Sequence, residues 1–184
     1  MYKLLLIISG WKVDTKTPEE YKRCVLVGAP HTSNWDLFYA ILLLKTLKVP
    51  FKFTIKKQWF RFPFNLIIGP LGGIPINTKK KEKNGNVKIM ADFFKKHKEF
   101  AMAITPEGTR SLREKWKSGF YHLAKDNDLP ICFGYLDYKT KIAGIGGPIF
   151  PTDDKAADMK KIMEFYNNKK PKYPEKFSLD KRFI

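Results

Sequence analysis

A continuous apolar run at residues 24–29, ended by Pro30, sets the kind of fold that this chain can form. Its residues are apolar or β-branched with no polar alternation, which is typical of a strand buried on both faces of a sheet. Two further apolar runs follow, at residues 100–104 and 130–136. Because helical patterns separate the runs, we expect an α/β fold with a mostly parallel mixed sheet and helices on both faces.

The rest of the chain divides into short elements. Apolar side chains at Leu37, Ile41 and Leu44 recur at helical spacing and predict a helix over 34–47. Further helices are predicted over 2–9, 86–97 and 118–126, further strands over 11–13, 51–55, 74–76 and 142–149, and an irregular, proline- and lysine-rich arm over 169–184. With 184 residues, no internal repeat and no long linker, the chain is expected to form one domain spanning 1–184.

Positive charge dominates the composition. The 35 Lys and Arg against 18 Asp and Glu give a net charge of +17, which attracts nucleic acid, anionic lipid headgroups, or an acidic carrier protein or phosphorylated cofactor. Most of these cations are lysines, which disfavours bidentate recognition of bases or phosphates and suits an anionic membrane surface. None of the usual nucleic-acid modules is visible, so no nucleic-acid partner is expected.

The apolar run Leu4 to Ile8 is much shorter than the roughly 20 residues that span a bilayer, and no signal-peptide cleavage site follows it. We therefore expect a cytoplasmic protein, peripheral on the inner face of the plasma membrane, where lysines meet an anionic leaflet. Cys24 and Cys132 lie in apolar runs without metal-ligand spacing. They are expected to be buried free thiols, and no metal site is expected.

The first candidate site is the pair His31 and Asp36. Within one helix, five positions turn through about 500°, so the two side chains would point about 140° apart. They can meet if His31 lies in a tight loop, one of residues 32–34 caps the following helix, and Asp36 projects back from its first turn. The aspartate would then orient the imidazole as a general base. A capped helix beside an ordinary surface histidine is the alternative.

The second motif, Thr-Pro-Glu-Gly-Thr-Arg-Ser at residues 105–111, follows the predicted strand 100–104. Together the two motifs resemble the glycerolipid acyltransferase superfamily, the family of 1-acylglycerol-3-phosphate acyltransferases. Its first block is His-x4-Asp and its third is Phe-Pro-Glu-Gly-Thr-Arg-Ser. The resemblance covers about residues 24–136. It implies a glycerol-3-phosphate acyltransferase-like fold, in which the active-site loops lie at the carboxyl ends of strands.

The other two family blocks match less well. The second block, Gly-x-Ile/Phe-x-Ile-Asp-Arg, corresponds to residues 72–78, where Thr78 replaces the usual arginine. The resemblance places Asn77 and Lys79 among the substrate-binding residues. In place of the usual arginine, Lys79, Lys80 or Lys81 would supply a less directional charge for a phosphate. The fourth block, at residues 129–134, is nonspecific.

The resemblance implies direct transfer of a fatty acyl group from acyl-CoA or acyl carrier protein to the hydroxyl of a lysophospholipid-type acceptor, in phospholipid or glycerolipid biosynthesis. His31 would be the general base and Asp36 its orienter. The substrate-binding residues of the second loop would be Glu107, Gly108, Thr109 and Arg110. Of these, Arg110 would bind a phosphate. No covalent acyl-enzyme and no cofactor besides the acyl donor are implied, and a structural Glu–Arg pair is the alternative for this loop.

Residues 56–68 interleave cations with aromatic residues. They suit an interfacial membrane segment, a packed helix and strand joined by a lysine turn, or the lining of an acyl-chain tunnel. For the chain as a whole, a thioesterase and a non-catalytic basic lipid- or nucleic-acid-binding domain are the rival functions. The absence of a Gly-x-Ser-x-Gly motif counts against a serine hydrolase.

Overall fold

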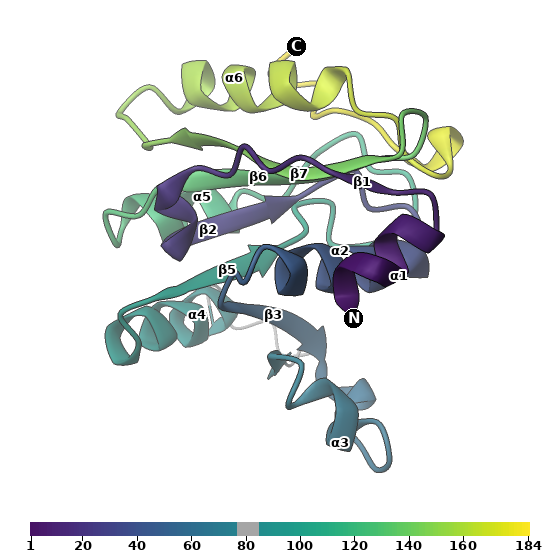
Figure 1. Cartoon of the computed structure of the whole chain (residues 1–184). Helices are drawn as coiled ribbons and strands as arrows, with labels where there is room; N and C mark the ends of the chain where they lie inside the picture. The colour runs from purple at the N-terminus through teal and green to yellow at the C-terminus, as the bar shows by residue number, and fades with distance from the viewer. Residues whose placement is uncertain (77–84) are drawn as a thin grey trace.

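The computed structural model describes residues 1–76 and 85–184 and contains a seven-stranded sheet (Figure 1). The strands are β1 (Lys12–Val13), β2 (Arg23–Gly28), β3 (Phe51–Lys56), β4 (Gly73–Ile76), β5 (Phe100–Ile104), β6 (Ile131–Asp137) and β7 (Ile142–Ile149). Their order across the sheet is β1-β7-β6-β2-β5-β3-β4. Only the β6–β7 pair is antiparallel among these neighbours. The predicted mostly parallel mixed sheet is confirmed.

Helices cover both faces of this sheet. They are α1 (Tyr2–Ile8), α2 (Asn34–Thr46), α3 (Asn65–Ile68), α4 (Gly85–Lys96), α5 (Gly119–Lys125) and α6 (Lys155–Asn167), with the short turns η1 (Glu19–Lys22), η2 (Lys57–Trp59) and η3 (Pro174–Lys176). Figure 1 shows α6 above β6 and β7, and α1 beside α2 on the other side. In the part of the chain that the structure describes, no helix has both the length and the apolar character needed to cross a membrane.

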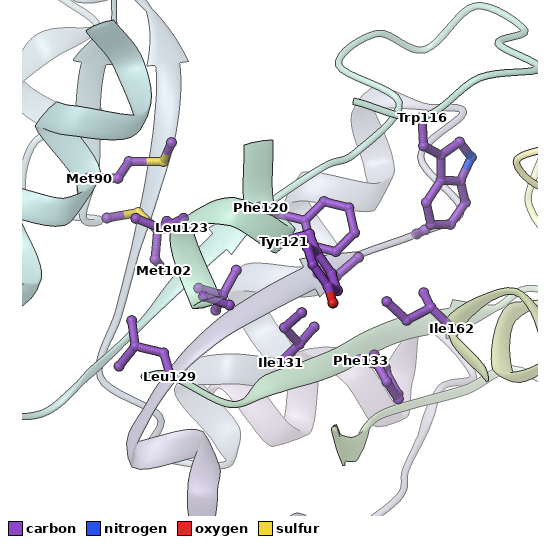
Figure 2. Close-up of a cluster of buried hydrophobic side chains, with 14 of the residues drawn as sticks. Met90, Met102, Trp116, Phe120, Tyr121, Leu123, Leu129, Ile131, Phe133 and Ile162 are labelled. Carbon is purple, nitrogen blue, oxygen red and sulfur yellow. The ribbon is translucent and has the colours of Figure 1, made fainter. Parts of the chain in front are cut away.

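The central strand β2 explains the layering. Val25 and Val27 belong to the largest buried cluster, together with side chains from α4, α5 and α6. Figure 2 shows the middle of this cluster, where Phe120 and Leu123 of α5 lie close to the strands. Cys24 and Leu26 alternate with the valines and pack on the opposite face, against the α2 side. The strand is therefore buried on both faces, as its uninterrupted apolar run predicts.

The second face also holds the cysteines and the N-terminal helix. Cys24 and Cys132 are both buried and free, as predicted. Leu6 of α1 and Trp11 are almost fully buried against Leu43 of α2, which fixes the N-terminal segment to the sheet.

Two segments differ from the sequence-based expectations. The sequence patterns predict no element over residues 155–167, but these residues form the 13-residue helix α6. The helix is capped by Asp154, whose Oδ1 accepts a hydrogen bond from the N–H of Ala157 at 3.0 Å. In residues 56–68 the packed-core interpretation is wrong, because Phe62 is 80% exposed and Leu66 is 63% exposed. The C-terminal arm, residues 169–184, is irregular apart from η3.

Candidate active site

Two loops meet at one edge of the sheet. β2 and β5 are parallel neighbours, and Val27 lies opposite Ile104 at their carboxyl ends. Residues 29–33 follow β2, and residues 105–118 follow β5. Because parallel strands end at the same edge, both sequence motifs lie there, as expected for a site in an α/β sheet.

The loop after β2 turns directly into α2. Ser33 is the N-cap residue, and its Oγ accepts a hydrogen bond from the N–H of Trp35 at 3.2 Å. Asp36, in the first turn, accepts from the N–H groups of Thr32 and Ser33 through Oδ2, at 2.7 and 2.8 Å. The sequence Thr-Ser-Asn-Trp-Asp thus forms a capping box that points the Asp36 carboxylate back toward the loop.

The same carboxylate contacts the histidine. Nδ1 of His31 lies 3.4 Å from Oδ2 of Asp36. The hydroxyl of Tyr138 donates to the other oxygen, Oδ1, at 2.6 Å. Burial works to raise the pKa of Asp36, but the bonds from His31, Tyr138 and the two backbone N–H groups outweigh it, so this pKa is lowered. Asp36 is therefore ionised at neutral pH and serves both the helix start and the imidazole.

This arrangement fixes which nitrogen of the imidazole is available for chemistry. With a carboxylate at Nδ1, the neutral ring carries its proton there and keeps a lone pair on Nε2. None of the described side chains or backbone groups forms a hydrogen bond with Nε2, and the His31 side chain is 20% exposed. The helix is capped, as in the surface-histidine alternative, and His31 in addition contacts the capping aspartate.

Glu107 joins the two loops. Its Oε1 accepts a hydrogen bond from the backbone N–H of His31 at 2.8 Å, and the residue is only 2% exposed. Its Oε2 is buried and has no hydrogen-bond partner among residues 1–76 and 85–184. Burial raises the pKa of Glu107 to about 8; the bond from His31 opposes this rise, and the charge of Asp36 adds to it. Glu107 therefore sits beneath the histidine and holds its backbone.

The rest of the Glu-Gly-Thr-Arg loop forms a tight turn. Gly108 has φ +66°, a left-handed conformation that favours glycine, and a Cβ there would also meet Nζ of Lys117 at 2.7 Å. Thr109 accepts a hydrogen bond from the N–H of Ser111 at 3.3 Å. Arg110 is exposed and forms no ion pair with any residue that the structure describes, which contradicts the structural Glu–Arg pair. Asn77 and Lys79 lie outside the described residues.

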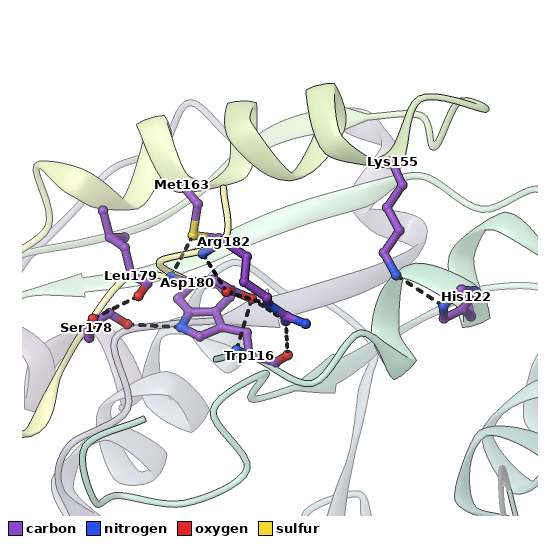
Figure 3. Close-up of polar contacts among 8 residues, drawn as sticks. All are labelled: Trp116, His122, Lys155, Met163, Ser178, Leu179, Asp180 and Arg182. Carbon is purple, nitrogen blue, oxygen red and sulfur yellow. Dashed lines mark hydrogen bonds and ion pairs between the residues drawn. The ribbon is translucent and has the colours of Figure 1, made fainter. Parts of the chain in front are cut away.

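The C-terminal arm holds the far end of the loop after β5 (Figure 3). Oδ2 of the fully buried Asp180 accepts from the backbone N–H of Trp116 at 3.0 Å, and the indole Nε1 donates to the carbonyl of Ser178 at 3.0 Å. Arg182 donates to the carbonyl of Trp116 at 2.9 Å and pairs with Asp180 at 2.6 Å. The arm thereby anchors the loop that carries Glu107 and Arg110.

Sequence reasoning missed Tyr138 and Asp180. Tyr138 lies in the turn after β6, 102 positions from Asp36, and Asp180 lies 64 positions from Trp116. No spacing rule links residues so far apart, so only the folded chain brings them together.

Comparison with known proteins agrees with this geometry. The model of the family described as Acyltransferase matches residues 12–133, about two thirds of the chain, which include both loops. A search of curated proteins found no match. The chain belongs to the acyltransferase family, the family of glycerolipid acyltransferases such as 1-acylglycerol-3-phosphate acyltransferases.

Proposed function

We propose that this acyltransferase moves a fatty acyl group from acyl-CoA or acyl carrier protein to the hydroxyl of a lysophospholipid-type acceptor, in phospholipid or glycerolipid biosynthesis. The observation that carries the proposal is the 3.4 Å contact between His31 Nδ1 and Asp36 Oδ2 at the carboxyl edge of the sheet. A general base held in one tautomer, whose second nitrogen has no hydrogen-bond partner among the described residues, suits activation of a hydroxyl.

The proposed reaction is a direct transfer. Nε2 of His31 takes the proton of the acceptor hydroxyl while that oxygen attacks the thioester carbonyl carbon. The carbon–sulfur bond then breaks, and the leaving thiolate takes the proton back from the imidazolium. The carboxylate of Asp36 stabilises the transient imidazolium, so the pair needs no covalent acyl-enzyme.

Substrate phosphate is the proposed partner of Arg110. This side chain is exposed, and it follows Glu107, which the His31 backbone holds in place. A guanidinium on an anchored loop favours bidentate binding of a phosphate, from the acceptor headgroup or from the donor. Gly108 and Thr109 shape the turn that presents it, and Lys79 is proposed to contribute charge to phosphate binding.

An anionic membrane is the proposed source of the acceptor. Large apolar side chains are exposed on three elements: Leu4, Ile7 and Ile8 of α1; Trp35, Leu37 and Phe38 of α2; and Trp59, Phe62, Phe64, Leu66 and Ile67 in and before α3. α1 contacts α2, Trp35 and Phe38 lie in the first turns after the His31 loop, and α3 follows the carboxyl end of β3 (Figure 1). Exposed apolar groups near the proposed base suit a lipid surface.

Charge supports the same partner. The net charge of +17 attracts anionic headgroups, and Lys56, Lys57 and Arg61 lie in the segment that carries the exposed Phe62. We propose that the protein lies on the cytoplasmic face of the plasma membrane with these groups in the interface.

The proposal is tested by incubating the protein with radiolabelled acyl-CoA and acyl carrier protein of several chain lengths, against a panel of lysolipids. We expect a labelled diacyl product with one donor class and one acceptor. Release of free fatty acid alone would instead indicate a thioesterase. Salt-sensitive binding to DNA or RNA on filters, without any acyl transfer, would indicate a binding domain.

A further inference from the structure

Tyr138 occupies a position that the proposed reaction does not yet use. Its hydroxyl donates to Oδ1 of Asp36 at 2.6 Å, the shortest of the bonds to that carboxylate. The two backbone N–H groups and the imidazole all meet the other oxygen, Oδ2. Tyr138 is therefore the only donor from the described residues that holds Oδ1, and it adds to the two backbone bonds that hold the carboxylate beside His31.

The tyrosine is itself fixed in place. Its ring meets Trp11 edge-on, with the ring centroids 5.0 Å apart, and Tyr39 at 6.4 Å. Its backbone N–H donates to the carbonyl of Lys170, at the start of the C-terminal arm, at 2.8 Å. Aromatic contacts on two sides and a backbone bond leave the hydroxyl little freedom, which is what positioning a carboxylate requires.

The hydroxyl keeps its proton at neutral pH and acts as a donor there. Burial raises the pKa of Tyr138, and the hydrogen bond to Asp36 raises it further. Other groups face the Asp36–Tyr138 pair from the surrounding elements: His31, Glu107, Tyr39 and Tyr173 as titratable side chains, and Lys141 as a cation 5.5 Å from the tyrosine ring. Among these, His31 is the group that changes charge in the proposed reaction.

We propose that Tyr138 is a positioning residue for the His31–Asp36 pair. Its hydroxyl holds Oδ1 of Asp36, so that Oδ2 stays directed at Nδ1 of His31. The same hydrogen bond draws negative charge away from Oδ2. The inference rests on the proposed function, because it assigns a role in the same reaction. It also links the C-terminal arm to catalysis through the Lys170 carbonyl.

The role has two separable consequences. Without the hydroxyl, Asp36 keeps the two backbone N–H donors on Oδ2 but loses the donor to Oδ1, and the imidazole is held less well for proton transfer, so kcat falls while KM stays nearly constant. The remaining charge on Asp36 also becomes less shared, so it stabilises the imidazolium more strongly. The acid side of the pH–kcat profile therefore moves to higher pH, which a purely structural role would not cause.

The test is Tyr138→Phe, which keeps the ring and removes only the hydroxyl. We expect kcat to fall about tenfold and the acid limb to move up by about half a pH unit. The matched control is Tyr135→Phe. It removes another tyrosine–aspartate hydrogen bond, in which the Tyr135 hydroxyl donates to Oδ2 of Asp14 at 2.8 Å. A second control is Tyr39→Phe, in the same aromatic cluster. Neither control is expected to move kcat or the acid limb.

A double-mutant cycle shows whether Tyr138 acts through the aspartate. In the Asp36→Asn background, Tyr138→Phe is expected to add little to the loss, because the carboxylate it positions is gone. Full additivity of the two losses would overturn the inference. So would wild-type kcat and an unmoved acid limb in a folded Tyr138→Phe protein.

NMR of the His31 ring provides a readout that needs no substrate, because the chemical shift of its Nδ1 proton reports the contact with Asp36. In Tyr138→Phe this chemical shift is expected to change, while the ring signals of His122 stay in place. If Tyr138→Phe did not fold, a fluorinated tyrosine at position 138, whose hydroxyl is a stronger donor, is expected to change the His31 signal in the opposite direction. A wild-type protein that transfers no acyl group but shows these changes would refute the proposed function alone; unchanged His31 signals in an active enzyme would refute the role of Tyr138.

Discussion

Single side chains at this site have two tasks each, and Asp36 is the clearest case. Oδ2 caps the first turn of α2 and faces Nδ1 of His31, while Oδ1 is held by Tyr138. The position of the base therefore depends on the same bonds that begin the helix. A substitution at Asp36 should disturb both functions, whereas loss of the cap at Asp154 on α6 should lower stability without changing activity.

Glu107 makes a pH-dependent prediction about stability. Its pKa is raised to about 8, so the folded protein keeps a proton on Glu107 at pH values at which the unfolded chain has already lost it. The favourable contribution of this proton to the free energy of unfolding is complete at acid pH and is lost as the pH rises to about 8. The free energy of unfolding therefore falls by at most about 1.4 kcal/mol per pH unit in this range. Glu107→Gln can still accept from the His31 N–H, and it should remove this slope.

The measurement is urea unfolding of wild type and Glu107→Gln at pH 5.5 and pH 7.5. We expect the wild type to lose more stability between the two values than the variant does. The control is Glu114→Gln, which changes an exposed carboxylate and should retain the wild-type slope. Equal slopes in wild type and Glu107→Gln would show that Glu107 is already ionised at pH 5.5.

Among the secondary-structure elements, the C-terminal arm has the most specific task. It holds Trp116 through Asp180, Ser178 and Arg182, and thereby anchors the loop that begins with Glu107. Asp180→Asn removes the carboxylate that Arg182 pairs with. We expect a loss of about 2 kcal/mol in the free energy of unfolding and faster proteolytic cleavage within residues 108–117.

Limited proteolysis with mass spectrometry checks this prediction. The control is Lys181→Gln, next to Asp180, which breaks only the exposed ion pair with Glu114 and should leave both stability and cleavage unchanged. Cleavage rates of Asp180→Asn equal to those of the control would mean that the arm does not anchor the loop.

Helices and strands could be predicted from the sequence where a local residue pattern alone determines the element. The apolar run of β2, the capping sequence before α2 and the strand before the Glu-Gly-Thr-Arg loop each carry their own signal. Helix α6 was missed, although Asp154 and the spacing of Met159, Ile162, Met163 and Tyr166 indicate a capped amphipathic helix. Its many lysines and the neighbouring prolines obscured that pattern.

The candidate site was predictable only in part. His31, Asp36 and Glu107 come together as the two sequence motifs indicate, because both motifs follow parallel neighbouring strands. The burial of Glu107 could not be predicted, since it depends on how the second loop packs under the first. Tyr138 depends on strand order, which places the β6–β7 turn beside the start of α2.

For the protein as a whole, the exposed apolar side chains and the net charge of +17 predict binding to an anionic bilayer. Replacing Phe62 and Ile67 together by serine should weaken binding to vesicles of anionic phospholipid by at least about tenfold. Binding of the wild type should also fall as salt screens the lysines. Vesicle co-sedimentation measures both effects.

Phe150→Ser is the control for that experiment. Phe150 is 59% exposed, but it follows β7, whose antiparallel direction places its end at the opposite edge of the sheet. This variant should bind vesicles like the wild type. If the double variant also bound like the wild type, the segment before and within α3 would not be the membrane contact.

The most direct test concerns His31 itself. With the donor and acceptor that give the highest turnover, kcat is measured for wild type, His31→Ala and His122→Ala, after circular dichroism has shown that all three are folded. His122 is exposed on α5 and contacts Lys155, away from Asp36, so its replacement is a matched control. We predict a loss of at least about 100-fold for His31→Ala and none for His122→Ala. A His31→Ala protein that retains wild-type kcat would contradict the assignment of His31 as the general base.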